Sequence, residues 1–162
     1  MKNNLSNNFP IVNLYKKKSL KSSVVTQLLY GDNFKIIKKY KNYSKIKINN
    51  DSYIGYTKNR NFTKSIRPDF KVSVLKAKIF KKPKISTGLK KFLSYGSKIK
   101  SVEKVGKFVK FEKNWIKLSN LKPFSFRHKN TFYDIKLFKN VKYVWGGKSY
   151  KGIDCSALLQ IL

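Results

Sequence analysis

Cysteine, histidine and acidic residues are scarce in this chain, and each shortage restricts what the chain can be. Its 162 residues include one cysteine, one histidine and seven acidic residues. A single cysteine cannot form an internal disulfide, which fits either a reducing compartment or a reactive thiol. No continuous apolar run reaches the length of a signal peptide or of a membrane span. We therefore expect a cytoplasmic protein with no membrane partner.

Basic residues are abundant by contrast. Lysine and arginine total 38, which gives a formal net charge of +31. Such an excess attracts polyanions, and it favours nucleic-acid binding where the basic residues cluster on one face. Here the lysines are spread from Lys2 to Lys151, among many Asn, Ile, Tyr and Phe. We interpret the charge mainly as compositional bias on solvated faces, with weak attraction to polyanions as a by-product.

The chain contains an internal repeat. The sequence LLYG from Leu28 aligns with LSYG from Leu93. At the same offset, Phe34, Tyr43 and Ile46 align with Ile99, Phe108 and Phe111. The apolar content, 41% of all residues, is enough for one sizeable core or for two to three small ones. The repeat therefore predicts two copies of one small unit.

Each copy has the pattern of short β-strands. Ser44, Ile46 and Ile48 alternate with residues on the other face, and turn residues such as Gly31-Asp32 and Asn49-Asn50-Asp51 interrupt the runs. Such alternation over a few residues is typical of strands joined by tight turns. We expect the repeated aromatic residues to fill cores: Tyr15, Tyr30, Phe34, Phe80 and Tyr95.

The single cysteine lies in the stretch YVWGGKSYKGIDCSALLQ, from Tyr143 to Gln160. Asp154 is a good N-cap for a helix, and it would place Cys155 in the first turn. The expected apolar stripe of that helix is Cys155, Leu158, Leu159 and Leu162. A helix N-terminus favours thiolate over thiol, and thiolate is the nucleophile. The alternative is that Cys155 is a small buried hydrophobic residue at the start of a core helix.

These motifs resemble a known combination of domains. Thr26 to Phe62 is similar to the bacterial SH3 domains attached to cell-wall hydrolases, and Lys71 to Leu121 is a degenerate second copy. The run YVWGGKSYKGIDCS resembles the segment that ends at the nucleophile of NlpC-family, papain-like cysteine peptidases, with Ala157 where that family usually has glycine. The resemblance implies a mainly β chain: two small SH3-like barrels, then the N-terminal helical part of a papain-like α+β catalytic domain.

The resemblance also implies domain boundaries and an activity. The expected parts are an N-terminal tail at 1–10, barrels at 11–64 and 70–122, and the start of the catalytic domain at 126–162. The implied enzyme is a cysteine endopeptidase (a hydrolase) that cuts the γ-D-glutamyl-L-diamino acid bond of murein peptides without cofactor or metal. The murein peptide would carry a free N-terminal L-alanine.

Site residues carry over one by one from the resemblance. Cys155 would be the nucleophile. Asp154, Asp32, Tyr53 and Ser156 would bind substrate, with Asp154, Asp32 and Tyr53 around the free α-amine of the L-alanine. For Asp32 an alternative remains open, because turns favour aspartate after a glycine such as Gly31.

One part of the family pattern is missing. The family places its histidine base many tens of residues after the cysteine, whereas the one histidine here, His128, precedes it in the segment FRHKNTFYDIKLF. That segment would be the first helix of the catalytic unit. We therefore expect a C-terminally truncated, inactive piece of a longer enzyme, in which Leu158, Leu159, Ile161 and Leu162 lack a core.

Two further alternatives concern location and class. An enzyme of the cytoplasm would recycle imported wall peptides, whereas a wall-associated lysin would use its positive charge to bind anionic wall polymers. A non-enzymatic pair of SH3-type barrels that binds cell-wall polymer or nucleic acid is the alternative from another class. The sequence leaves the oligomeric state open.

Overall fold

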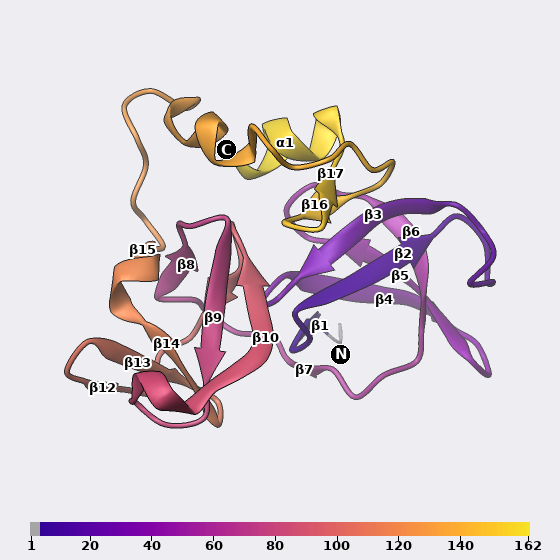
Figure 1. Ribbon diagram of the computed structural model, residues 1–162. Coiled ribbons are helices and arrows are strands. Elements are labelled where there is room, and N and C mark those ends of the chain that lie inside the picture. The colour runs from indigo at the N-terminus through magenta and orange to yellow at the C-terminus, as the bar shows by residue number, and fades with distance from the viewer. Residues whose placement is uncertain (1–3) are drawn as a thin grey trace.

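The computed structural model describes residues 4–162, which form three units in chain order (Figure 1). The first unit is an antiparallel seven-stranded sheet with the order β3-β2-β6-β5-β4-β1-β7. Its strands are β1 (Asn4–Ser6), β2 (Ile11–Tyr15), β3 (Val24–Leu29), β4 (Asn33–Lys39), β5 (Tyr43–Ile48), β6 (Ile54–Lys58) and β7 (Thr63–Lys64).

The expected alternation is present in the first unit. On β5, Ser44, Ile46 and Ile48 are buried, and Phe34 of β4 faces Ile48 across the ladder. Burying three such apolar side chains stabilises the sheet by roughly 1.5–3 kcal/mol each. The expected N-terminal tail is different, because β1 pairs with both β4 and β7. Part of the range 1–10 therefore belongs to the sheet, and residues 1–3 lie outside the described residues.

The second unit contains two smaller sheets. The five-stranded sheet has the order β10-β9-β14-β13-β12, and the three-stranded sheet has the order β11-β8-β15. Their strands are β8 (Phe70–Val72), β9 (Lys76–Phe80), β10 (Gly88–Ser94), β11 (Lys98–Ile99), β12 (Glu103–Val105), β13 (Phe108–Phe111), β14 (Asn114–Lys117) and β15 (Leu121–Pro123). Two 3₁₀ turns, η1 (Ile85–Thr87) and η2 (Leu118–Asn120), connect strands in this unit.

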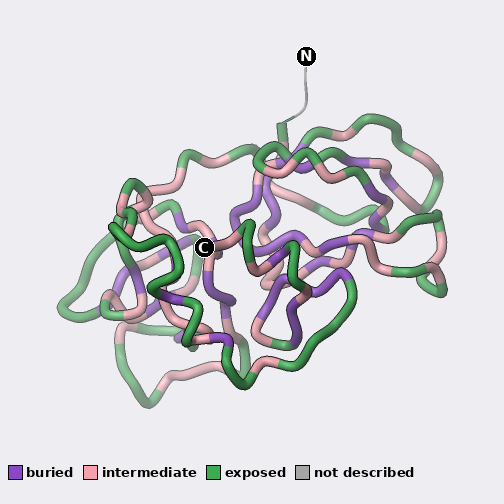
Figure 2. The backbone as a smooth tube through the Cα atoms, turned by 90° about the horizontal axis from the view of Figure 1, so that it is seen from above, coloured by how far each residue is buried: buried purple, intermediate pink, exposed green. Residues whose placement is uncertain are grey.

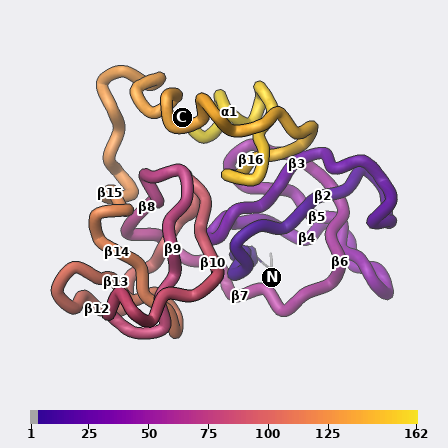
Figure 3. The backbone as a smooth tube through the Cα atoms, in the orientation of Figure 1, coloured from indigo at the N-terminus to yellow at the C-terminus, as the bar shows by residue number. Residues whose placement is uncertain are grey.

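The third unit is small and contains the only α-helix of the described residues. It consists of the 3₁₀ helix η3 (Tyr133–Phe138), the short pair β16 (Lys148–Ser149) and β17 (Gly152–Ile153), and α1 (Cys155–Ile161). The segment expected to form the first helix of the catalytic unit contains the 3₁₀ helix η3. In Figures 1 and 3 this unit, in orange and yellow, lies over both barrels. The mainly β architecture with a C-terminal helix confirms the predicted fold class.

The inward face of α1 differs from the predicted stripe. Ala157 is buried, and Leu158, Ile161 and Leu162 pack on a cluster of Tyr95, Phe138 and Ile153. Cys155 is exposed, and 66% of Leu159 is exposed. The small Ala157 side chain allows the helix to approach the cluster, so the face that contains it turns inward. The expectation that Leu158, Ile161 and Leu162 lack a core was therefore wrong.

The two barrels are joined through the turn after β3. Tyr30 lies in the core of the second unit, edge-on to Phe111 with ring centroids 5.4 Å apart. Gly31 has φ +79°, and a Cβ there would lie 2.1 Å from the carbonyl oxygen of Lys98. The Lys98 N–H also donates to the Tyr30 carbonyl over 2.8 Å. Only glycine fits this contact, because it tolerates both the positive φ and the close approach.

In Figure 2 the buried stretches of the chain run mainly through the interior, and the stretches at the periphery are mainly exposed. The buried apolar side chains of residues 4–162 form four separate clusters rather than one core. Within residues 4–162, no helix is both long enough and apolar enough to cross a membrane.

Candidate active site

The loop before Cys155 depends on two adjacent glycines. Gly146 has φ +69°, and a Cβ there would lie 2.5 Å from the carbonyl oxygen of Val24 in the first barrel. A Cβ on Gly147 would lie 2.6 Å from the carbonyl oxygen of Gly152. The glycine pair therefore lets the turn press against β3 and β17 at once. This packing fixes where α1 begins.

Asp154 caps α1, as predicted. Its Oδ1 accepts hydrogen bonds from the Ala157 N–H over 2.7 Å and from the Ser156 hydroxyl over 2.8 Å. Its Oδ2 accepts from the Gly146 N–H over 2.9 Å. The carboxylate thus ties the glycine turn to the first turn of the helix.

Cys155 and Ser156 are exposed at this helix start. Among the residues that the structure describes, the backbone N–H of Cys155 donates to no other group. A thiol next to a free N–H is the arrangement that acyl transfer needs, since the N–H can stabilise an oxyanion formed by attack of the sulfur. Nearby in sequence, Trp145 is 72% exposed.

His128 is held in a separate cluster. Its Nε2 lies 3.2 Å from Asp134 Oδ2, and its ring stacks on Tyr133 with centroids 4.5 Å apart. The Tyr95 hydroxyl donates to the same Asp134 oxygen over 2.8 Å. No hydrogen bond joins His128 to Cys155 within the described part of the chain. The geometry therefore gives His128 a carboxylate partner but no contact with the thiol.

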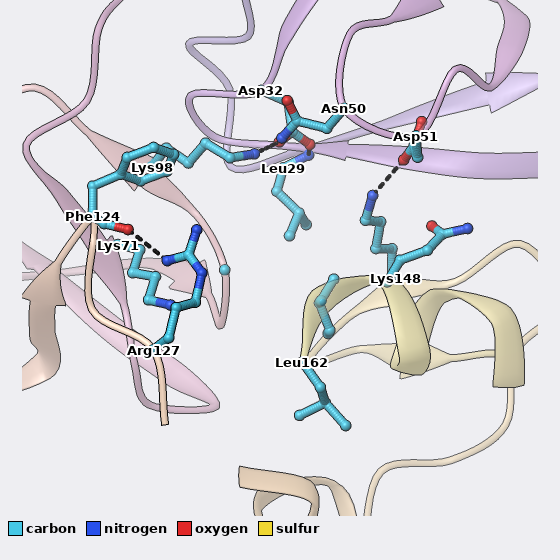
Figure 4. Close-up of a pocket in the computed structure, with 13 residues that line it drawn as sticks. Leu29, Asp32, Asn50, Asp51, Lys71, Lys98, Phe124, Arg127, Lys148 and Leu162 are labelled. Carbon is cyan, nitrogen blue, oxygen red and sulfur yellow. Dashed lines mark hydrogen bonds and ion pairs between the residues drawn. The ribbon is translucent and has the colours of Figure 1, made fainter. Parts of the chain in front are cut away.

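Asp32 lies elsewhere, at a cavity of about 490 Å³ between the two barrels and the end of α1 (Figure 4). Its Oδ2 accepts from the Leu29 N–H over 2.8 Å, and its Oδ1 pairs with the Lys98 ammonium from the second barrel. The Asp32 side chain of this pair is 4% exposed and the Lys98 side chain is 14% exposed. Asp32 therefore stabilises its turn, as one sequence alternative held, and it is also a partner in a buried ion pair.

A second ion pair lines the same cavity. Lys148 Nζ lies 2.7 Å from Asp51 Oδ2, and both side chains are 8% exposed. The Lys148 backbone N–H donates to Gln27 Oε1 over 2.9 Å, which anchors β16 to the first barrel. The ion pair therefore links the glycine-rich loop to the turn between β5 and β6.

The predicted site residues fall into three places. Asp154, Cys155 and Ser156 meet at the start of α1. Asp32 lines the cavity, whereas Tyr53 packs partly buried against the first core and does not line it. Their roles toward substrate stay predictions. Sequence reasoning missed the cavity residues Asp51, Lys71, Lys98, Arg127 and Lys148, which no local motif distinguishes among so many basic residues.

Metal-ligating residues do not gather in the described chain: within residues 4–162, no three His, Cys, Asp or Glu side chains are close enough together to hold an ion.

Comparisons with known proteins agree with this architecture. The family model of the bacterial SH3 domain matches residues 12–62. The chain also matches the solved structure of an NlpC/P60 family protein from Bacillus cereus ATCC 10987, with a TM-score of 0.76 and 14% identity. The match covers 96% of this chain and 70% of that one. No curated protein matches the chain. The first unit is therefore similar to bacterial SH3 domains, and nearly the whole chain shares the fold of the NlpC/P60 protein.

Proposed function

We propose that this chain is the SH3-bearing, nucleophile-bearing part of a cysteine peptidase that hydrolyses the γ-D-glutamyl-L-diamino acid bond of murein peptides. The observation that carries the proposal is the exposed Cys155 directly after the Asp154 cap, in a loop that two glycines press onto the first barrel. The bacterial SH3 match and the NlpC/P60 fold support it. The site of action is either the cytoplasm or the cell wall.

The proposed reaction has two steps. Cys155 Sγ attacks the γ-carbonyl carbon of D-glutamate, a C–S bond forms, the C–N bond to the diamino acid breaks, and the amine leaves with the proton given up by the thiol. Water then hydrolyses the thioester and releases the γ-carboxylate. The Cys155 N–H stabilises the oxyanion in each step.

Within residues 4–162, no general base forms a hydrogen bond with Cys155. A neutral imidazole is the usual base for a cysteine nucleophile, and the one histidine of the chain is bound to Asp134 instead. We expect the 162-residue chain to turn over very slowly unless imidazole is supplied from solution.

The test is chemical rescue. The chain is incubated with L-Ala-γ-D-Glu-diaminopimelate, with and without added imidazole, and the release of diaminopimelate is followed by mass spectrometry. The proposal predicts release that rises with imidazole and is abolished by Cys155→Ala. Equal release by Cys155→Ala, or none at any imidazole concentration, contradicts it.

A second candidate function is supported by the unbalanced charge. Among residues 4–162, ion pairs with carboxylates engage only four lysines, namely Lys98, Lys100, Lys110 and Lys148. The remaining basic side chains of a chain with net charge +31 would attract a wall polymer or nucleic acid. Steep loss of binding between low and moderate salt, with no preference among polyanions, would favour this binding module over the peptidase.

A further inference from the structure

The resemblance implies that Asp32 helps to hold an ammonium group, but the charges of the cavity that Asp32 lines indicate otherwise. Asp32 already forms an ion pair with Lys98 of β11, and Asp51 forms one with Lys148. Both carboxylates of the lining are therefore neutralised within the chain. A substrate amine would have to displace a lysine that is held at its backbone by the Tyr30 carbonyl.

Two further basic residues line the cavity and have no such partner. They are Lys71, on β8, and Arg127, after β15. Within residues 4–162, neither forms an ion pair with a carboxylate. Among the side chains that line the cavity, four are basic and two are acidic, an excess of two positive charges. Figure 4 shows Lys71 and Arg127 together on one side of the cavity, away from the Lys148–Asp51 pair.

The register of the second unit places Lys71 opposite lysines on both neighbouring strands, β11 and β15. Lys71 and Lys98 are directly opposite each other on β8 and β11. Like charges in opposed positions destabilise a sheet. Lys98 forms an ion pair with Asp32, which offsets its charge. The pKa of Lys71 is lowered, first by burial and then by the charge of Arg127, and the charge of Asp134 acts in the opposite direction. A bound anion would relieve the repulsion between Lys71 and Arg127.

Arg127 is oriented for such a ligand. One guanidinium nitrogen donates to the carbonyl oxygens of Phe124 and Phe126, each over 2.8 Å. This engages Nη1 and leaves Nε and Nη2 as donors, the pair of groups that binds a carboxylate or phosphate in two parallel hydrogen bonds. Arg127 is exposed as a residue, and these two hydrogen bonds hold its guanidinium on the side of the cavity where Lys71 lies.

We propose that Lys71 and Arg127 form a binding site for an oxyanion group, a carboxylate or a phosphate, in the cavity between the barrels and α1. The site recognises the acidic part of its ligand and does not read a free amine through Asp32. Because a murein peptide carries several carboxylates, this inference deepens the proposed function and rests on it for the identity of the ligand, but the anion site itself is measurable without turnover.

The test is a titration of the whole chain, followed by calorimetry or NMR, with three probes: glutarate, inorganic phosphate and the neutral analogue glutaramide. We expect saturable binding of an anion and none of glutaramide. The double variant Lys71→Met/Arg127→Gln should weaken anion binding about tenfold or more, the loss expected for charge-assisted hydrogen bonds. Whichever anion binds more tightly identifies the oxyanion as carboxylate or phosphate.

Three controls make the result specific. Lys41→Met/Arg67→Gln removes the same two charges from exposed positions that do not line the cavity and should change the dissociation constant less than about twofold. Asp32→Asn/Lys98→Met removes a pair that is neutral overall and should also retain the anion. Cys155→Ala should bind it like the unmodified chain, so loss of the peptidase and loss of the site are separate outcomes. Equal binding of glutarate and glutaramide, or equal weakening by Lys41→Met/Arg67→Gln, overturns the proposal.

Discussion

Tyr30 and Tyr95 occupy equivalent positions in the two copies, and each places its ring in the unit that follows its own. Tyr30 packs in the core of the second unit, and Tyr95 packs with Phe138 of the third. Each hydroxyl has an acidic neighbour there: Glu112 for Tyr30 and Asp134 for Tyr95. Each of these two tyrosines therefore links its own unit to the next, so the three units are joined in series. The cluster around Tyr95 also contains Ala157, and it packs the first turns of α1 against the second unit.

The first prediction concerns alkaline pH. Burial, followed by the charge and hydrogen bond of Glu112, raises the pKa of Tyr30 well above its ordinary value of 10.0. The folded state holds this proton more tightly than the unfolded state, so the stabilisation is complete below about pH 10 and is lost as the pH rises above it. The slope for one such group is about 1.4 kcal/mol per pH unit.

Tyr30→Phe should remove the contribution of Tyr30 to the fall in stability at alkaline pH. Urea unfolding of both proteins between about pH 9 and about pH 11 should show the original chain losing stability faster than the variant. Parallel curves across this range would mean that the Tyr30 hydroxyl is not buried in the second unit.

The second prediction concerns the glycine at the seam. Gly31→Ala should strongly destabilise the chain, because the new Cβ would overlap the Lys98 carbonyl at a positive φ. Gly106→Ala is a matched control, since Gly106 also has a positive φ, +52°, but a Cβ added there would meet no atom within 4 Å. The control should lose only about 1 kcal/mol of stability, which is the cost of placing an alanine at a positive φ without any steric overlap. Similar urea midpoints for the two variants would contradict the close contact between the barrels.

A third prediction tests the buried Asp32–Lys98 pair. Asp32→Asn or Lys98→Met alone should destabilise the chain by about 3–5 kcal/mol, because each leaves a buried charge without its partner. The double variant should recover much of the loss, since both charges are then gone. A double-mutant cycle by urea unfolding measures this coupling, and purely additive losses would exclude a direct pair.

The fourth prediction concerns the cap of α1. Asp154→Ala removes the acceptor of the Ala157 and Gly146 N–H groups and should cost about 0.5–2 kcal/mol. Hydrogen exchange should then accelerate in α1 and in the glycine loop, but not in the core of the first barrel. Unchanged exchange at Ala157 would show that the carboxylate does not cap the helix.

Much of the fold could be predicted from the residues alone, because short-range patterns determine it. Alternation located β5, turn residues located its ends, and Asp154 marked the start of α1. The inward face of α1 could not be predicted, since Cys155, Ala157, Leu158, Leu159, Ile161 and Leu162 offer several apolar faces. Packing against Tyr95 and Phe138 decides between them.

The cavity charges could not be predicted, because they depend on long-range pairing. Lys98 and Asp32 are separated by 66 positions, and Lys148 and Asp51 by 97. In a chain with 38 lysines and arginines, nothing local marks which of them meets a carboxylate. Motif similarity predicts that Asp32 faces substrate, a role that stays a prediction, and it gives no sign that Lys98 is the partner of Asp32 in the folded chain.

The most direct test of the central claim is acylation of Cys155 by an activated substrate. An aryl thioester of L-Ala-γ-D-glutamate transfers its acyl group to Cys155 Sγ as the aryl thiolate leaves, and this step requires no acid to protonate a leaving amine. Intact-mass spectrometry should show saturable, single acylation that Cys155→Ala abolishes, at least about tenfold faster than with the γ-L-glutamyl thioester. Equal, non-saturating rates with the two stereoisomers would show that Cys155 is only an exposed thiol, and would contradict the peptidase assignment.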